Sequence, residues 1–214
     1  MVVAVSNQKG GCGKSTVACH LAVMSAVDGK KTLLVDMDPQ GSALAFREIR
    51  SDSLPNFIAT KEDKPLLHRQ IDEYTKDYER IIVDSGGRDS KLFRSAMLSA
   101  DLIVIPYEPG QFDFLSLQDT LETLGEVRSI KDVDALIVLN KLIVGTKLSS
   151  GAFEEVKRIA DANHVKIAHT QLGMRVGYSE AIGKGMSVTE CHGDNFNYPK
   201  VEMKSLYEEI FTKE

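Results

Sequence analysis

Residues 9–16 read K-G-G-C-G-K-S-T and carry the clearest chemical pattern in this sequence. They lie between a short apolar run at residues 2–5 and a second apolar run, at residues 17–24, that has helical spacing. Closely spaced glycines let successive backbone N–H groups turn toward one anion, and the helix that follows adds the positive end of its dipole. In a loop of this kind Lys14 reaches the β- and γ-phosphates of a nucleotide, and the Ser15 hydroxyl binds Mg²⁺. The pattern therefore predicts a phosphate-binding loop between a strand and a helix.

Two more apolar runs, at residues 31–36 and 80–84, each end in an aspartate. Because ligands bind beyond the carboxyl ends of the strands in a parallel sheet, Asp36 and Asp84 are expected to lie beside the loop. A strand that ends in an aspartate is the Walker B pattern, in which the carboxylate holds Mg²⁺ through water. Many strands end in an aspartate for no chemical reason, but the phosphate-binding pattern upstream favours the metal role. We therefore predict that Asp84 belongs to a magnesium site.

Apolar runs alternate with helical patterns along the whole sequence and predict a parallel sheet covered by helices on both faces. The stronger runs show no polar alternation, as expected for strands that are buried on both sides. The predicted fold class is α/β: a single-domain P-loop NTPase with a mostly parallel twisted sheet, over residues 1–214. Pro106 is expected to end one of the strands. Strands are predicted at residues 2–5, 31–36, 57–59, 80–84, 102–105, 135–139 and 165–168, and the last two helices at residues 178–184 and 200–212.

Length and composition limit the class of protein. A chain of 214 residues, 43% hydrophobic and 27% charged, is long enough to bury one large core. The net charge of −5 argues against a globally basic nucleic-acid binder and leaves a local basic patch open. Three cysteines without C-x-x-C spacing indicate neither disulfides nor a metal cluster. No signal stretch precedes the first strand and no apolar run approaches the roughly 18 residues of a membrane span, so a cytoplasmic location is expected.

The loop pattern K-G-G-x-G-K-[ST] resembles the deviant Walker A loop of the ParA/MinD family of ATPases. Residues 36–41, D-M-D-P-Q-G, look like the switch I region of that family, and residues 139–141, L-N-K, resemble its base-recognition segment. Residues 84–87, D-S-G-G, and 106–109, P-Y-E-P, are similar to segments of small ParF-like (type Ib) plasmid partition ATPases, which place small residues after the Walker B aspartate. The resemblance implies an ATP hydrolase that requires ATP and Mg²⁺ and has weak intrinsic activity.

The resemblance also implies roles for individual residues. In the family, the lysine that matches Lys9 reaches across a nucleotide-sandwich dimer to the partner's phosphates, and the second switch aspartate, here Asp38, orients the attacking water. Asp36 is expected in the Mg²⁺ shell. Asn140 either pairs with adenine or caps a turn at the end of its strand, and both interpretations stay open. Cys12 occupies the variable position of the loop and is interpreted as filler rather than as a nucleophile, with a pKa lowered by neighbouring lysines as the open alternative. The predicted catalytic residues are Lys9, Lys14 and Asp38, the predicted nucleotide-binding residues are Gly10, Gly11, Cys12, Gly13, Lys14, Ser15, Thr16 and Asn140, and the predicted metal-binding residues are Ser15, Asp36 and Asp84.

The function that the resemblance implies is the partition or positioning of plasmid or chromosome DNA by an ATP-dependent homodimer. In the family, the ATP-bound dimer binds double-stranded DNA without sequence preference, and a small cargo-binding activator (ParB/ParG-like) stimulates hydrolysis. Basic residues of the C-terminal part contact the DNA backbone, which makes Arg175 and Lys184 the predicted DNA contacts, with Lys200 and Lys204 as weaker additions. Scattered lysines on a solvated face are the alternative for these positions. The ATP-bound form is expected to associate with the nucleoid.

Two alternative functions stay open. A membrane-positioning ATPase of the MinD kind needs a basic amphipathic C-terminal helix. Residues 204–214 contain three glutamates, so a stable membrane anchor is not expected. The other alternative is that the cargo is a protein assembly rather than DNA. A redox relative that resembles the nitrogenase iron protein would need paired cysteines for a cluster, and the sequence does not have them.

Overall fold

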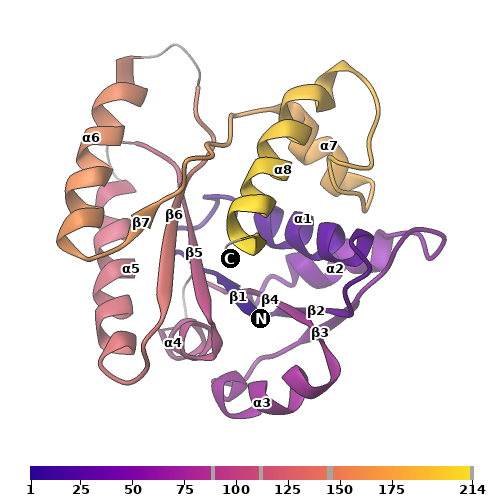
Figure 1. Cartoon of the computed structure of the whole chain (residues 1–214), viewed down its shortest axis with the longest axis horizontal. Coiled ribbons are helices and arrows are strands. Elements are labelled where there is room, and N and C mark those ends of the chain that lie inside the picture. The colour runs from indigo at the N-terminus through magenta and orange to yellow at the C-terminus, as the bar shows by residue number, and fades with distance from the viewer. Residues whose placement is uncertain (88–89, 111–112, 144–146, 213–214) are drawn as a thin grey trace.

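Seven strands form one sheet at the centre of the structure, in the order β3-β2-β4-β1-β5-β6-β7 (Figure 1). The computed structural model describes residues 1–87, 90–110, 113–143 and 147–212. Neighbouring strands are parallel throughout the sheet, which confirms the predicted α/β fold class. The strands are β1 (Val2–Val5), β2 (Thr32–Asp36), β3 (Ile58–Lys61), β4 (Arg80–Asp84), β5 (Leu102–Tyr107), β6 (Asp134–Leu139) and β7 (Lys166–Ile167).

Helices cover both faces of this sheet, as predicted (Figure 1). No helix in the part of the chain that the structure describes is long and apolar enough to cross a membrane. One face carries α1 (Lys14–Val27), α2 (Ser42–Ile49), α7 (Val176–Gly183) and α8 (Asn197–Phe211), with the short 3-10 helix η1 (Asp194–Phe196) before α8. The opposite face carries α3 (Leu67–Asp77), α4 (Ser90–Ser99), α5 (Asp113–Arg128) and α6 (Lys147–Ala162).

The strands separate two hydrophobic cores. In β1, Val3 and Val5 pack into the core under α1, α7 and α8, whereas Val2 and Ala4 pack into the core on the opposite face. Successive side chains of a strand point to opposite faces, so a strand between two helical layers must be apolar at every position. This is why the strand sequences are continuous apolar runs.

β5 passes through Pro106, and the prediction that this proline ends the strand is wrong. The strand continues to Tyr107, and Pro106 lies opposite Val138 of β6. Proline is tolerated here because the pairing of β5 with β1 reaches only as far as Val104, so that side of the ladder requires no N–H from position 106. The other predicted strands are present, and the last two helices begin a few residues earlier than predicted.

Candidate functional site

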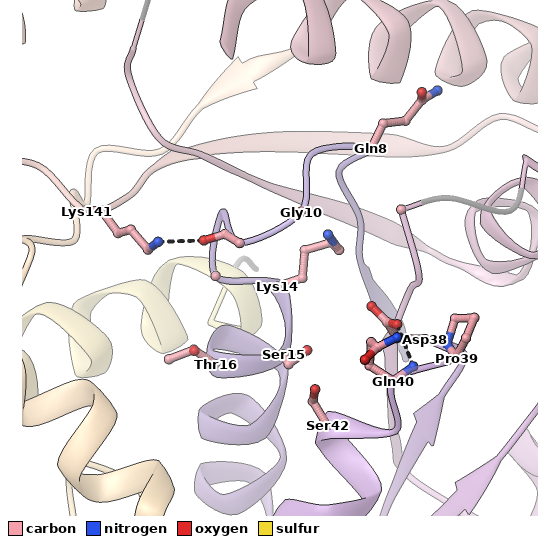
Figure 2. A pocket seen from close by; sticks show the side chains of 13 residues that line it. Gln8, Gly10, Lys14, Ser15, Thr16, Asp38, Pro39, Gln40, Ser42 and Lys141 are labelled. Atoms are coloured by element: carbon pink, nitrogen blue, oxygen red, sulfur yellow. Dashed lines mark hydrogen bonds between the residues drawn. The ribbon is translucent and has the colours of Figure 1, made fainter. Parts of the chain in front are cut away.

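The loop after β1 lies at the carboxyl ends of the central strands, between the ends of β4 and β5. Gly11 and Gly13 have φ angles of +78° and +99°, a left-handed backbone that other residues adopt only with strain. The loop leads directly into α1, as predicted, and together with residues 38–42 it lines a cavity of about 740 Å³, which we call the loop cavity. The side chains of Lys14 and Ser15 gather around this space with that of Asp38 (Figure 2).

Hydrogen bonds from distant segments fix the path of the loop. Asn7 is buried directly after β1; its Nδ2 donates to the carbonyl of Pro106 at 2.7 Å, and its Oδ1 accepts the N–H of Lys9 at 2.9 Å. The Lys14 ammonium donates to the carbonyl of Lys9 at 2.8 Å and so closes a ring across the loop. The hydroxyl of Thr120 in α5 accepts another loop N–H at 3.1 Å. The sequence pattern did not single out Asn7 or Thr120, although a polar residue directly after a buried strand was a usable signal for Asn7.

Asp84 ends β4, and its side chain is completely buried. Among the described residues, neither of its carboxylate oxygens has a hydrogen-bond partner. Burial raises the pKa of Asp84 to about 7. The nearby Ser15 hydroxyl, which makes no well-formed hydrogen bond to the carboxyl, and the Lys14 ammonium oppose this rise, while Asp36 and Asp38 add to it. A buried carboxylate without partners is costly, and a cation is the natural group to complete it.

The donor set around Asp84 fits Mg²⁺. Within the described ranges, no three His, Cys, Asp or Glu side chains lie together in a way that could hold a metal ion. The Asp84 carboxylate and the Ser15 hydroxyl instead lie close to each other beside the loop cavity, which Ser15 lines. Mg²⁺ is commonly held in this way, by one or two protein oxygens that share the ion with water and nucleotide phosphates.

Asp36 organises the loop that carries Asp38. Its buried carboxylate accepts the N–H of Asp38 at 3.0 Å and the N–H of Leu44 at 2.9 Å, and lies 3.3 Å from the ammonium of Lys61. Both oxygens are therefore engaged, which favours a role for Asp36 in holding this loop over its predicted place in the Mg²⁺ shell. The Lys61 ammonium also donates to the carbonyl of Asp38. The carboxylate of Asp38 accepts the N–H of Gln40 at 2.9 Å and borders the loop cavity (Figure 2).

The backbone after Asp84 lies between two loops: that of residues 6–13, which we call the phosphate loop, and the loop that carries Asp38. A Cβ atom on Gly87 would lie 2.5 Å from the carbonyl oxygen of Gln8, and one on Gly86 would lie 3.0 Å from that of Met37. Real Cβ atoms do not approach oxygens this closely, so larger residues would displace one loop or the other. This contact is a physical reason for the small residues in the D-S-G-G segment.

Lys9 and Lys141 share one carboxylate at the rim of the loop cavity. The Nζ atoms of Lys9 and Lys141 lie 3.8 Å and 3.2 Å from Oε2 of Glu108. Lys141 also donates to the carbonyl of Gly11 at 2.5 Å (Figure 2). Partly exposed ion pairs of this kind contribute about 0–1 kcal/mol, so Lys9 can exchange its partner at little cost.

Asn140 follows β6, and its side chain contacts the backbone of the phosphate loop. Its Nδ2 donates to the carbonyl of Cys12 at 2.7 Å, and its Oδ1 accepts the N–H of Lys141 at 2.9 Å. The amide lies so close to the loop that a Cβ atom on Gly13 would be 2.2 Å from Nδ2. Of the two interpretations left open by the sequence, the structure favours the turn-capping one over pairing with adenine.

A second cavity of about 480 Å³, which we call the side cavity, adjoins the loop cavity. Gly13, Thr16 and Lys141 border both cavities. The remaining walls come from Val17, Asn140 and Met203, from residues 172–175 and from α7, and they are mostly apolar. A hollow of this composition beside a phosphate loop suits a flat heterocyclic ring.

Arg175, a predicted DNA contact, is engaged inside the protein. Its Nη2 lies 2.7 Å from the carboxylate of Glu202, and its guanidinium lies 4.7 Å from the centre of the Tyr198 ring. The hydrogen bond to Glu202 raises the pKa of Arg175, with burial opposing the rise. These contacts make Arg175 less available to an outside phosphate than the sequence suggested.

The predicted lysine contacts differ in their exposure. Lys184 is exposed at the end of α7, with Nζ 5.4 Å from the centre of the Phe196 ring. Lys200 is partly buried and donates to the carbonyl of Cys191 at 2.9 Å, whereas Lys204 is exposed on α8. Lys184 is therefore the best placed of the nominated cations to meet DNA.

The pKa of Cys12 is raised rather than lowered, which favours the interpretation of this residue as filler over the alternative of a reactive thiol. The side chain is completely buried under the loop, with Sγ 3.4 Å from the carbonyl oxygen of Lys9. Burial raises the pKa of Cys12, and the opposing effect of Lys14, Lys9 and Lys141 does not reverse this. The thiol is an inert filler in this setting.

Known proteins resemble this chain over most of its length. Residues 3–188 match the family model described as the CobQ/CobB/MinD/ParA nucleotide binding domain. The maintenance of carboxysome distribution protein A of Gloeobacter kilaueensis is 28% identical over 210 residues, covering 98% of this chain and 93% of that protein. The sporulation initiation inhibitor protein Soj of Bacillus subtilis is 26% identical, covering 87% of this chain and 89% of that protein. The structure of a variant McdA from Cyanothece in complex with ATP is similar in fold, with a TM-score of 0.82 at 17% identity, and covers 100% of this chain and 96% of that one.

Proposed function

Because this chain belongs to the CobQ/CobB/MinD/ParA family of nucleotide-binding domains, we propose that it is an ATPase whose ATP-bound dimer positions cargo. ParA and MinD proteins, which give this family part of its name, are ATPases. One observation carries the proposal: the buried carboxylate of Asp84, which has no hydrogen-bond partner among the described residues, lies close to Lys14 and Ser15 at the end of the phosphate loop and to Asp38. This is the set of groups that phosphoryl transfer to water requires.

The groups around the phosphate loop have separate roles in this proposal. The glycine backbone of residues 10–13 and the Lys14 ammonium hold the phosphates. Ser15 and Asp84 would hold Mg²⁺, which supplies positive charge to the β- and γ-phosphates. Asp38 orients the attacking water, and the contacts that Asp36 makes to the backbone hold Asp38 in place. Positioning and electrostatic stabilisation are the main contributions that a protein makes to this reaction.

Lys9 acts across a dimer in this proposal. In its own chain the phosphates are already served by Lys14, and the ion pair of Lys9 with Glu108 is weak. When a second copy closes over the loop cavity, Lys9 reaches the phosphates of that copy and stabilises charge there in the manner of an arginine finger. ATP would then control dimer formation.

The side cavity takes the base of the nucleotide. It begins at Gly13 and Thr16, directly beside the phosphate loop, so a nucleotide with its phosphates in the loop cavity extends into it. Asn140 lines this cavity, and one hydrogen bond at each of its amide atoms already goes to the protein, so the base is bound mainly by the apolar walls.

The proposed cargo is plasmid or chromosome DNA, carried along the nucleoid by non-specific DNA binding of the dimer and released by a ParB/ParG-like activator. Exposed Lys184 is consistent with such a contact, while the internal pairing of Arg175 weakens it. A protein cargo is the second candidate. It is favoured by the likeness, over 98% of this chain, to a protein named for carboxysome distribution.

Sedimentation velocity tests the switch. We expect the Asp38→Ala protein to sediment as a dimer with Mg²⁺ and ATP and as a monomer with ADP, because hydrolysis is blocked while the triphosphate site is kept. The Lys14→Ala protein should bind no nucleotide and remain monomeric in both. If the ATP-bound dimer binds DNA without sequence preference, adding duplex DNA of arbitrary sequence should produce a species that sediments faster. An Asp38→Ala protein that binds ATP and stays monomeric would contradict the proposal.

A further inference from the structure

The carboxylate of Glu202, in α8, accepts hydrogen bonds from residues that line the side cavity. Its Oε2 accepts the N–H of Gly173 at 3.2 Å and the hydroxyl of Tyr178 at 2.9 Å. Its Oε1 accepts a hydrogen bond from Nε of Arg175 at 2.8 Å and lies 2.7 Å from Nη2 of the same side chain. One carboxylate therefore holds three residues that lie on two different elements.

The three residues border the side cavity, and Glu202 stands behind them. The Arg175 side chain packs directly against Gly173, so closely that a Cβ atom there would lie 2.9 Å from Nε of Arg175. The arginine side chain is thus folded back against the strand-like segment before α7, and its charge is satisfied by Glu202. Charge-assisted hydrogen bonds of this geometry are the stronger class, so this wall is held in one arrangement.

The same wall is connected to the phosphate loop. The ring of Tyr178 meets the ring of His20 edge-on, with their centres 5.6 Å apart. Nδ1 of His20 lies 2.8 Å from the carbonyl oxygen of Thr16, on the first turn of α1. His20 is completely buried, and burial lowers its pKa to about 4, so it is neutral near pH 7. Glu202 is thereby linked, through Tyr178 and His20, to the first turn of the helix that follows the phosphate loop.

We propose that Glu202 is a positioning residue for the base of the bound nucleoside triphosphate. It holds Gly173, Arg175 and Tyr178 as one wall, so that the base finds a preformed site, and it makes no contribution to holding the phosphates. The proposal rests on the proposed function of the side cavity. It also assigns Arg175 to the nucleotide site in place of the DNA surface.

Comparing two ligands separates this role from a general contribution to folding. Tripolyphosphate occupies only the phosphate loop, whereas the non-hydrolysable analogue AMPPNP also places a base in the side cavity. Isothermal titration with Mg²⁺ present should show that Glu202→Ala weakens AMPPNP binding by about ten-fold, since buried groups that lose their hydrogen-bond partner cost about this much or more. Tripolyphosphate affinity should change by less than about two-fold. In turnover assays KM for ATP should rise while kcat stays close to that of the unmodified protein.

Two further variants make the test decisive. Glu208→Ala removes an exposed carboxylate from the same helix and should change neither affinity. Tyr178→Phe removes one hydrogen bond to Glu202 but keeps the ring. It should also lower the affinity for AMPPNP, by a smaller factor than Glu202→Ala. If Glu202→Ala does not fold, Tyr178→Phe decides the question.

The outcomes distinguish the two proposals. If the unmodified protein binds neither ligand, the proposed ATPase function fails. If it binds both ligands equally well, the base does not use the side cavity and the assignment of Glu202 is overturned. The assignment is also overturned if AMPPNP binds more tightly than tripolyphosphate and Glu202→Ala lowers both affinities equally, or neither.

Discussion

Both terminal nitrogens of Arg50 bind the carboxylate of Glu190, at 2.9 Å and 2.7 Å, and join the end of α2 to the segment after α7. The Arg50 side chain is completely buried and that of Glu190 is 12% exposed. Arg50 also donates to the carbonyl oxygens of Pro55 and Gly185, so its donors are well used. This pair connects the helix that follows the Asp38 loop with the segment that carries Lys184.

Removing one partner of this pair should be costly. Arg50→Met leaves the Glu190 carboxylate in a largely buried place without its cation, and we expect a loss of about 3–5 kcal/mol in the free energy of unfolding. Urea denaturation measures this value. Arg94→Met is the matched control, because Arg94 pairs with Glu126 at an exposed position, and it should cost about 1 kcal/mol or less. Equal losses in the two variants would contradict the importance given to burial.

Asp84→Asn should stabilise the protein in the absence of metal. The pKa of Asp84 rises from 3.8 to about 7 on folding, so between these pH values the folded chain keeps a proton that the unfolded chain has released. Stability then falls as the pH rises through this window. Between pH 5 and pH 8, in EDTA, the unmodified protein should lose about 3 kcal/mol more than the variant.

Magnesium provides the second half of this test. At pH 8, Mg²⁺ with nucleotide should stabilise the unmodified protein, because the ligands bind the folded state. The gain should be much smaller for Asp84→Asn, which has lost the proposed carboxylate ligand. If Mg²⁺ with nucleotide stabilised both proteins by the same amount, Asp84 would not be a ligand of the metal.

Lys61 is a further residue with a testable role. Its ammonium ties the edge strand β3 to the carboxylate of Asp36 and to the carbonyl of Asp38. Lys61→Met should lower kcat by about ten- to hundred-fold through displacement of Asp38, with little change in ATP affinity. Lys64→Met, an exposed lysine three residues later, should leave kcat unchanged. An equal loss in affinity and kcat would point to a damaged phosphate loop instead.

DNA binding can be assigned by its dependence on salt. Lys184→Glu should weaken ATP-dependent binding to arbitrary duplex DNA and should lower the slope of log affinity against log salt concentration by about one or more. Arg175→Met should have the smaller effect on this slope, because its guanidinium is already paired with Glu202. Lys157→Glu, on the exposed side of α6, is the control of equal charge change. If Arg175→Met has the larger effect, the surface must lie around Arg175.

The fold was predictable because its signals are local. Continuous apolar runs identified the strands, and the spacing of apolar residues between them identified the helices. Pro106 misled the prediction because a proline inside a strand is tolerated only where the neighbouring strand has ended, and the sequence does not show where β1 ends relative to β5. The single domain over residues 1–214 and the ParF-like subtype stay predictions.

The sequence by itself determined the glycine-rich loop between β1 and α1, since residues 9–16 are adjacent and the glycines set the path of their own backbone. Only the tertiary structure decided which polar groups are already engaged, as Asn140 is with the carbonyl of Cys12, and which is left without a partner, as Asp84 is within the described part of the chain. The reason is physical. A hydrogen bond such as that of Asn140 joins residues 128 positions apart, and packing of the sheet and helices brings them together.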